Sequence, residues 1–204
     1  MKLISLLEKL EYTCLQGSTD QEVKNVIYDS RKVEEGSLFI CIRGAVVDGH
    51  KFVPDVVAKG AKVLIVEEAV EAPEDVTVIL VKDTRYAMAL ISAAYFGYPA
   101  EKLKTIGITG TKGKTTTTFM IKEILEKAGK KVGLIGTIAT YINGKKIKDS
   151  DRTTPESLEL QQIFAQMVEQ GVEVVVMEVS SQSLKLNRVE GCDLSLIHIS
   201  EPTR

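Results

Sequence analysis

The chain has 204 residues, of which 44% are hydrophobic and 26% are charged, a composition typical of a globular protein with one or two domains. Its formal net charge is −2, which disfavours nucleic acid or another polyanion as a partner. The longest apolar runs, such as residues 172–179, are too short and interrupted to span a bilayer, and the N-terminal segment lacks a signal peptide's cleavage pattern. We therefore expect a cytoplasmic protein without a nucleic-acid partner or membrane insertion.

The three cysteines, Cys14, Cys41 and Cys192, lie far apart and form no C-x-x-C motif. An odd count without metal-ligand spacing is typical of reduced thiols in a cytoplasm, and we expect most of them to be buried. A catalytic cysteine would need a nearby base, and the chain has only two histidines, His50 and His198. The pattern therefore disfavours cysteine catalysis.

The first half of the chain alternates short strands with short helices, which is the pattern of a compact α/β unit. The expected helices cover residues 3–10, 52–59 and 84–96, and the expected strands cover residues 26–28, 38–42, 63–66 and 76–81. Gly60 ends the second of these helices, and the sequence Gly97-Tyr98-Pro99 ends the third. We therefore expect a domain boundary at about residue 97.

The second half opens on a β-branched strand, a glycine-bounded turn and an amphipathic helix, all within residues 105–128. Gly110 and Gly113 would let consecutive backbone N–H groups face an anion, and the helix directs its positive end to the same place. Lys114 supplies an ammonium group for the β- and γ-phosphates, and Thr115 supplies a hydroxyl that can ligate Mg²⁺. This combination predicts a nucleoside triphosphate site.

The turn differs from the common phosphate-binding loop, because Ile108 stands where the first glycine of that pattern belongs. The alternative is a glycine-rich turn that binds nothing. With the lysine and threonine in a strand–loop–helix context, we predict that a nucleoside triphosphate is bound by the residues of the tighter variant, Gly110, Thr111, Lys112, Gly113, Lys114, Thr115 and Thr116.

Beyond this helix the pattern predicts a strand at 132–135, a hairpin turning at Asn143-Gly144, a helix to residue 170, and a continuous apolar strand at 172–177. Thr154 is the expected N-cap of that helix, with Pro155 in its first turn. Because ligands of parallel sheets bind at the carboxyl ends of strands, Glu178 would lie beside the loop and hold the same Mg²⁺ as Thr115. Its alternatives are a solvated strand end or a helix cap.

Four sequence blocks follow one another along the chain. They are D-S-R-K-V-x-x-G-x-L-F at 29–39, D-G-H-x-F at 48–52, T-G-T-K-G-K-T-T-T at 109–117, and T-T-P-E at 153–156 with E-V-S-S at 178–181. Through them the chain resembles the Mur ligase family over residues 1–193. The first two blocks also fit the MurF branch of the family, and the last block favours the MurE branch.

The resemblance implies an ATP-dependent amide ligase of peptidoglycan synthesis, with ATP and Mg²⁺ as cofactors. Such a ligase activates the carboxylate of a UDP-MurNAc-dipeptide by γ-phosphoryl transfer, and the amine of a diamino acid, meso-diaminopimelate or L-lysine, attacks the acyl phosphate. The reaction depends on charge neutralisation and in-line positioning, for which Lys114, Thr115 and Glu178 are the implied catalytic residues. The full-length relative is expected to be monomeric.

The resemblance also implies a set of residues that bind the UDP-MurNAc-dipeptide, with the uridine end in the N-terminal part and the sugar-peptide portion in the second part. Each has a simpler structural reading, such as turn chemistry at a serine, a helix cap at a threonine or a surface charge at an arginine. The set consists of Tyr28, Ser30, Gly44, Ala45, Val46, Val47, Thr153, Thr154, Ser180 and Arg188.

The expected fold is α/β, with a small UDP-MurNAc-binding domain at 1–97 followed by the first part of a phosphate-loop, parallel-sheet ATPase domain at 98–193. Two features depart from the family pattern. Gln182 replaces a histidine common in relatives, and residues 194–204 do not continue the family sequence, so we expect a non-native tail on a truncated N-terminal fragment. We expect no ligase turnover from the fragment alone and an exposed, association-prone sheet edge.

Three alternatives stay open at this point. The chain could belong to a MurF-type adding enzyme or to the related folylpolyglutamate synthetases, although the latter should lack the blocks at 29–39 and 48–52. It could also be a UDP-sugar-binding module without catalysis, which would bind the UDP ligand but not ATP.

Overall fold

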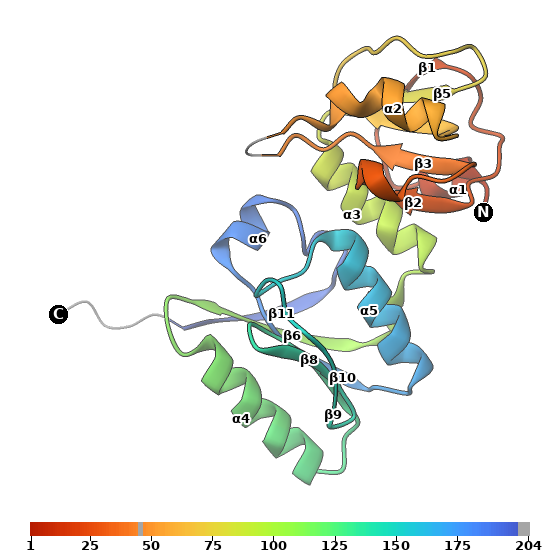
Figure 1. The fold of residues 1–204 in the computed structure, drawn as a ribbon. Helices are drawn as coiled ribbons and strands as arrows, with labels where there is room; N and C mark the ends of the chain where they lie inside the picture. Colours follow the sequence, from red (N-terminus) through yellow and green to blue (C-terminus); the bar gives the residue numbers. More distant parts are fainter. Residues whose placement is uncertain (45–46, 200–204) are drawn as a thin grey trace. The chain divides into compact units, whose positions relative to one another are not determined.

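The computed structural model describes residues 1–44 and 47–199, and the chain divides into two compact units, Met1–Tyr95 and Phe96–Arg204 (Figure 1). Each unit is built on its own sheet, and both sheets are mainly parallel. The predicted α/β fold class is therefore confirmed. Among the described residues, no helix combines the length and the apolar character needed to cross a membrane.

Unit 1 contains a five-stranded sheet in the order β1-β5-β4-β3-β2. Its strands are β1 (Thr13–Gln16), β2 (Asn25–Ile27), β3 (Ser37–Ile40), β4 (Val63–Val66) and β5 (Thr77–Leu80). Four strands run parallel, and only β1 pairs antiparallel, with β5. Every residue of β3 and β4 is buried, as expected for the centre of a sheet covered on both faces.

The helices of unit 1 cover this sheet. They are α1 (Leu3–Leu6), α2 (Val53–Ala58) and α3 (Thr84–Tyr95), with short 3₁₀ turns η1 (Ser30–Lys32) and η2 (Gly49–Phe52). Residues of α2 share a core cluster with alternate strand residues, including Phe39 and Leu64, and α2 and α3 lie on opposite faces of the sheet (Figure 1).

Unit 2 contains a six-stranded sheet in the order β11-β6-β10-β7-β8-β9. The strands are β6 (Lys104–Gly110), β7 (Val132–Ile135), β8 (Ala139–Ile142), β9 (Lys145–Asp149), β10 (Val174–Glu178) and β11 (Leu194–Ile199). The first four strands in this order are parallel, and β8 and β9 add an antiparallel hairpin. Asn143 and Gly144 turn it with φ values of 50° and 78°, which confirms the predicted two-residue turn.

Two long helices cover opposite faces of this second sheet. α4 (Lys114–Lys127) packs Ile121 and Leu125 on Ile108 and Val176, whereas α5 (Ser157–Glu169) packs on the other face in a cluster that includes Met177. The shorter elements are α6 (Ser181–Lys185) and the 3₁₀ turn η3 (Pro99–Lys102). The loop before α4 and the turn after β10 thus lie at the carboxyl edge of the parallel strands (Figure 1).

Several predicted boundaries were wrong. The first helix covers only Leu3–Leu6, and the exposed strand β1, the helix α6 and the strand β11 were not predicted. Residues 200–204 lie outside the described part of the chain, and the origin of 194–204 stays a prediction.

Thr154 is not the N-cap of α5, which begins at Ser157 with Glu156 as its N-cap residue. The hydroxyl of Thr154 instead donates to the carbonyl of Glu178 and accepts from the N–H of Ser180. A tertiary contact with the turn after β10 has therefore replaced the local capping bond that the sequence favours.

The thiols differ in their exposure. Cys41 is buried and Cys192 is half-buried, and burial raises the pKa of each to about 12. Cys14, on the edge strand β1, is exposed and therefore does not fit the expectation of mostly buried thiols. The thiolate is the reactive form, and a thiol with a pKa near 12 stays protonated at pH 8.

We predict that an aromatic disulfide reagent at pH 8 modifies Cys14 quickly in the folded chain, and that Cys41 and Cys192 react only after denaturation. Counting the released chromophore with time measures this directly, and Cys14→Ser should remove the fast phase. A fast phase that persists in this variant would contradict the assignment.

Candidate functional site

The loop between β6 and α4 is a tight turn bounded by two glycines, both of which have positive φ values. Gly110 has a φ of 139° and Gly113, the N-cap of α4, has a φ of 81°, conformations that favour glycine. The ammonium Nζ of Lys114 donates to the carbonyl oxygens of Gly110 at 2.6 Å and Thr111 at 3.3 Å. The lysine therefore lies across its own loop, next to the N-terminus of a fourteen-residue helix.

Glu178 ends β10, directly beside this loop. In the parallel register Glu178 lies opposite Ile108 of β6, and Glu178 is only 1% exposed. Its Oε1 accepts the hydroxyl of Thr115 at 3.0 Å, so the predicted proximity of Thr115 and Glu178 is confirmed. Parallel pairing of β6 with β10 produces this contact, because it places both carboxyl ends at one edge.

Thr137, which follows β7, supplies two more donors to the same carboxylate. Its N–H donates to Oε1 of Glu178 at 2.9 Å, and its hydroxyl donates to Oε2 at 3.0 Å. The neighbouring Gly136 leaves the space that the carboxylate fills, since a Cβ there would lie 2.5 Å from Oε1. A buried acid with three donors and a glycine cradle is a built polar site.

These residues fit a magnesium ion. Mg²⁺ prefers hard oxygen ligands, often one or two carboxylates together with phosphate oxygens and water. The hydroxyl of Thr115 and the carboxylate of Glu178 supply oxygen donors only, next to a loop whose N–H groups suit phosphate.

A second group with metal-ligand spacing, Asp48, His50 and Glu68, does not fit a cation. Nδ1 of His50 lies 2.6 Å from Oδ1 of Asp48, and its Nε2 accepts the N–H of Glu67 at 3.0 Å, so both ring nitrogens are occupied. The guanidinium group of Arg43 pairs with Asp48 and Glu68. The group is therefore an internal ion-pair network.

This network explains the D-G-H block as a folding element. Asp48 caps η2 by accepting the N–H of His50, and a Cβ on Gly49 would lie 2.7 Å from the backbone nitrogen of Ile42. Acid, glycine and histidine are thus each required by local packing and hydrogen bonding.

The predicted substrate residues of unit 2 lie close to Glu178. The backbone carbonyl of Thr154 accepts from Nη1 of Arg188 at 3.3 Å, and the hydroxyl of Thr153 lies 3.1 Å from that of Thr137. Ser180 caps α6, where its side chain accepts the N–H of Ser183 at 3.1 Å. The structure therefore brings Thr153, Thr154, Ser180 and Arg188 together at one edge of the sheet.

The predicted substrate residues of unit 1 lie in two loops. Tyr28 and Ser30 flank Asp29, which caps η1, and Gly44 donates its N–H to the carbonyl of Val47 at 2.9 Å. Ala45 and Val46 lie outside the described residues. Gln182 is an exposed residue of α6.

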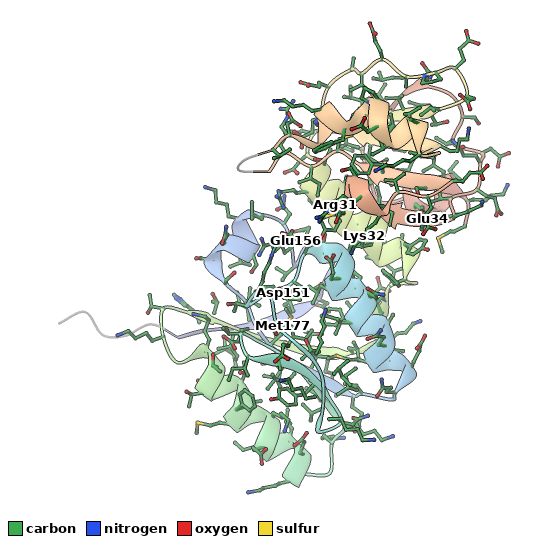
Figure 2. The ribbon with its side chains drawn as sticks, viewed as in Figure 1. Arg31, Lys32, Glu34, Asp151, Glu156 and Met177 are labelled. Carbon is green, nitrogen blue, oxygen red and sulfur yellow. The ribbon has the colours of Figure 1, made fainter. Side chains whose placement is uncertain are left out.

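Sequence reasoning missed two residues at this site, Glu156 and Thr137. Glu156 lies directly before α5 (Figure 2), where its Oε1 contacts Nη2 of Arg188 at 2.8 Å and also pairs with Arg152. Arg188 is 7% exposed, so it is a buried cation and not the surface charge considered above. The T-T-P-E block at 153–156 was the available signal for Glu156.

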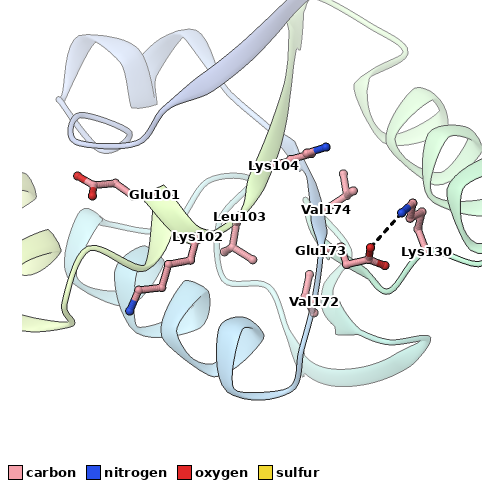
Figure 3. A pocket seen from close by; sticks show the side chains of 8 residues that line it. All are labelled: Glu101, Lys102, Leu103, Lys104, Lys130, Val172, Glu173 and Val174. Carbon is pink, nitrogen blue, oxygen red and sulfur yellow. Dashed lines mark hydrogen bonds and ion pairs between the residues drawn. The ribbon is translucent and has the colours of Figure 1, made fainter.

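A separate hollow of about 440 Å³ lies at the opposite, amino ends of β6 and β10. Glu101, Lys102 and Lys104 point in different directions around it, and Lys130 pairs with Glu173 (Figure 3). Its charged groups do not converge on one point, so they define no ligand.

We predict that Glu156→Gln lowers the free energy of unfolding by about 3 kcal/mol, because Arg188 would keep a buried charge without its anionic partner. Urea denaturation followed by circular dichroism measures the change. Glu169→Gln, a change of an exposed residue at the end of α5, should leave stability within about 0.5 kcal/mol. Equal stability of the two variants would show that the buried ion pair contributes nothing.

Two family models match the chain. A model described as the Mur ligase middle domain matches residues 108–199, and one described as the Mur ligase family, catalytic domain, matches residues 22–96. Together they include the loop, Glu178 and the blocks of unit 1.

Curated proteins and solved structures give the same relationship. The chain is 57% identical over 191 residues to the UDP-N-acetylmuramoyl-L-alanyl-D-glutamate--2,6-diaminopimelate ligase of Clostridium perfringens, an alignment that covers 94% of this chain and 39% of the relative. A solved ligase of that name aligns with a TM-score of 0.79 at 22% identity, covering 100% of this chain and 41% of the other, and shows the shared fold. MurF from Acinetobacter baumannii aligns with a TM-score of 0.60 at 26% identity, covering 88% and 36%. The chain thus spans about two fifths of the length of the curated relatives it matches.

Proposed function

Because the chain belongs to the Mur ligase family, we propose that it forms the UDP-substrate and nucleotide-binding part of an ATP-dependent ligase of peptidoglycan synthesis. The whole ligase would join 2,6-diaminopimelate to UDP-MurNAc-L-Ala-D-Glu, and the names of the curated relatives support this amino acid over lysine. The observation that carries the proposal is the contact of Thr115 with the buried Glu178 beside a glycine-bounded loop. The ATP, the cytoplasmic location and the monomeric state are parts of the same proposal.

The loop would bind the phosphates of ATP. Backbone N–H groups from Gly110 to Thr116 and the N-terminus of α4 present positive potential to the anion. The ammonium of Lys114, now bonded to the carbonyls of Gly110 and Thr111, would exchange them for β- and γ-phosphate oxygens. An exposed Lys112 adds positive charge at the rim.

Mg²⁺, when bound, would neutralise charge on the transferring phosphoryl group. Thr115 and Glu178 are the residues that would hold it, with the carboxylate fixed by Thr137. The protein's own contribution is therefore positioning and charge, which is what phosphoryl transfer requires.

The sugar-peptide part of the substrate would lie against Thr153, Thr154, Ser180 and Arg188. A guanidinium group suits a carboxylate through paired N–H donors, and Glu156 holds that of Arg188 beside the loop edge. The substrate carboxylate would attack the γ-phosphorus with release of ADP, and the amine would then displace phosphate from the acyl phosphate. The uridine end would lie against Tyr28, Ser30 and the segment 44–47.

We predict that Lys114→Ala abolishes measurable ATP affinity in isothermal titration calorimetry, because the ammonium group that bonds across the proposed phosphate cradle is lost. Affinity for UDP-MurNAc-L-Ala-D-Glu, titrated separately, should not change. Lys127→Ala removes an exposed lysine from the other end of α4 and serves as the control. Undiminished ATP binding by the Lys114 variant would refute the nucleotide site.

A further inference from the structure

We infer that Thr137 is a positioning residue that orients the Glu178 carboxylate and links it to the hydroxyl of Thr153. The inference rests on the proposed function, since it concerns the use of Glu178 with Mg²⁺ and ATP. Thr137 belongs to none of the four sequence blocks that carry the family resemblance. Thr137 lies in the turn between β7 and β8. Because β7 is the neighbour of β10 in the sheet, this turn reaches the end of β10 and Glu178.

Thr137 contacts both oxygens of the carboxylate. Its backbone N–H reaches Oε1 and its hydroxyl reaches Oε2, at 2.9 Å and 3.0 Å. Two donors from one residue, one on each oxygen, fix the rotation of the carboxyl group about its last bond. Hydrogen bonds to an ionised acceptor are stronger than neutral ones, so this orientation is well held.

The direction of the hydroxyl bonds follows from counting protons. The hydroxyl of Thr137 has one proton and lies within reach of both Oε2 of Glu178 and the hydroxyl of Thr153. An ionised carboxylate can only accept, so Thr137 donates to Glu178 and must accept from Thr153. The three groups therefore form a directed chain from the proposed peptide-binding threonine to the proposed metal-binding acid.

The same count identifies the oxygen that can take a cation. Oε1 accepts two donors, the hydroxyl of Thr115 and the N–H of Thr137, whereas Oε2 accepts the hydroxyl of Thr137 alone among the described residues. Each carboxylate oxygen has about two lone-pair directions, so Oε2 keeps the spare one. The hydroxyl of Thr137 thus sets the position of the oxygen that would be available to Mg²⁺.

The test uses the full chain and compares ATP affinity with and without Mg²⁺ by calorimetry. Thr137→Val keeps the backbone N–H and the β-branched shape but removes the hydroxyl. We expect the affinity for ATP with Mg²⁺ to fall about tenfold, the magnitude of one charge-assisted hydrogen bond, while the affinity without Mg²⁺ stays unchanged. Thr137→Ser restores the hydroxyl and should recover most of the loss.

Two further variants separate positioning from general stability. Thr153→Val removes the outer hydroxyl of this hydrogen-bond chain. We expect a smaller loss of Mg²⁺-dependent ATP affinity, because the hydroxyl of Thr153 bonds to Thr137 and not to the carboxylate of Glu178. Thr13→Val, an exposed threonine of β1, should bind as the unsubstituted chain does. The urea midpoint of each variant reports the fold independently.

The outcomes distinguish the inference from the proposed function. If the unsubstituted chain binds ATP with a Mg²⁺ dependence and Thr137→Val matches it, the inference is wrong and the proposed function stands. If affinity falls equally with and without Mg²⁺, Thr137 acts on the fold and the inference is also wrong. Absence of Mg²⁺-dependent binding in the unsubstituted chain would overturn both.

Discussion

The hydroxyl of Thr115 and the carboxylate of Glu178 meet at 3.0 Å, although the two residues lie 63 positions apart in the sequence. This hydrogen bond joins the first turn of α4 to the end of β10. A carboxylate that is almost fully buried must be hydrogen-bonded, so its neighbours have to be placed accurately. The first turn of α4 and the turn after β7 supply the donors to this carboxylate, and the segment before α5 bonds to the backbone carbonyl of the same residue.

The sheet makes that arrangement possible. β10 lies between β6 and β7, and all three are parallel, so their carboxyl ends deliver the glycine loop, Thr137 and Glu178 to one edge. The faces are covered by α4 and α5, which keep the strands dry and rigid. A site built on strand ends in this way has little freedom to rearrange, which suits a reaction that depends on positioning.

The sequence predicts those parts of the structure in which a local backbone geometry requires a particular residue type. Glycine and lysine spacing predicts the loop, and the rule for parallel strands predicts that Glu178 lies beside it. The Asn143-Gly144 turn was predictable for the same reason, since its left-handed backbone restricts the residue type. In each case a single residue type is required by one local geometry.

Tertiary contacts decided the features that the sequence did not reveal. Thr154 has the sequence context of a helix cap, yet the turn after β10 uses its hydroxyl, and Pro155 with Glu156 stays outside the helix. Thr137 has no periodic or motif signal, because its partners come from β10 and from the segment before α5. The strand β1 is exposed at Thr13, Cys14 and Leu15 and lacks an apolar face, so its pairing with β5 defines it.

A double-mutant cycle on Thr115 and Glu178 tests the central claim most directly. The affinity of the full chain for ATP with Mg²⁺ is measured for Thr115→Val, Glu178→Gln and the double variant. The contact predicts non-additive losses, with the double variant little weaker than Glu178→Gln alone and a coupling energy of about 1.5 kcal/mol or more. Losses that add within about 0.5 kcal/mol would show that the two residues act independently, and would contradict the account.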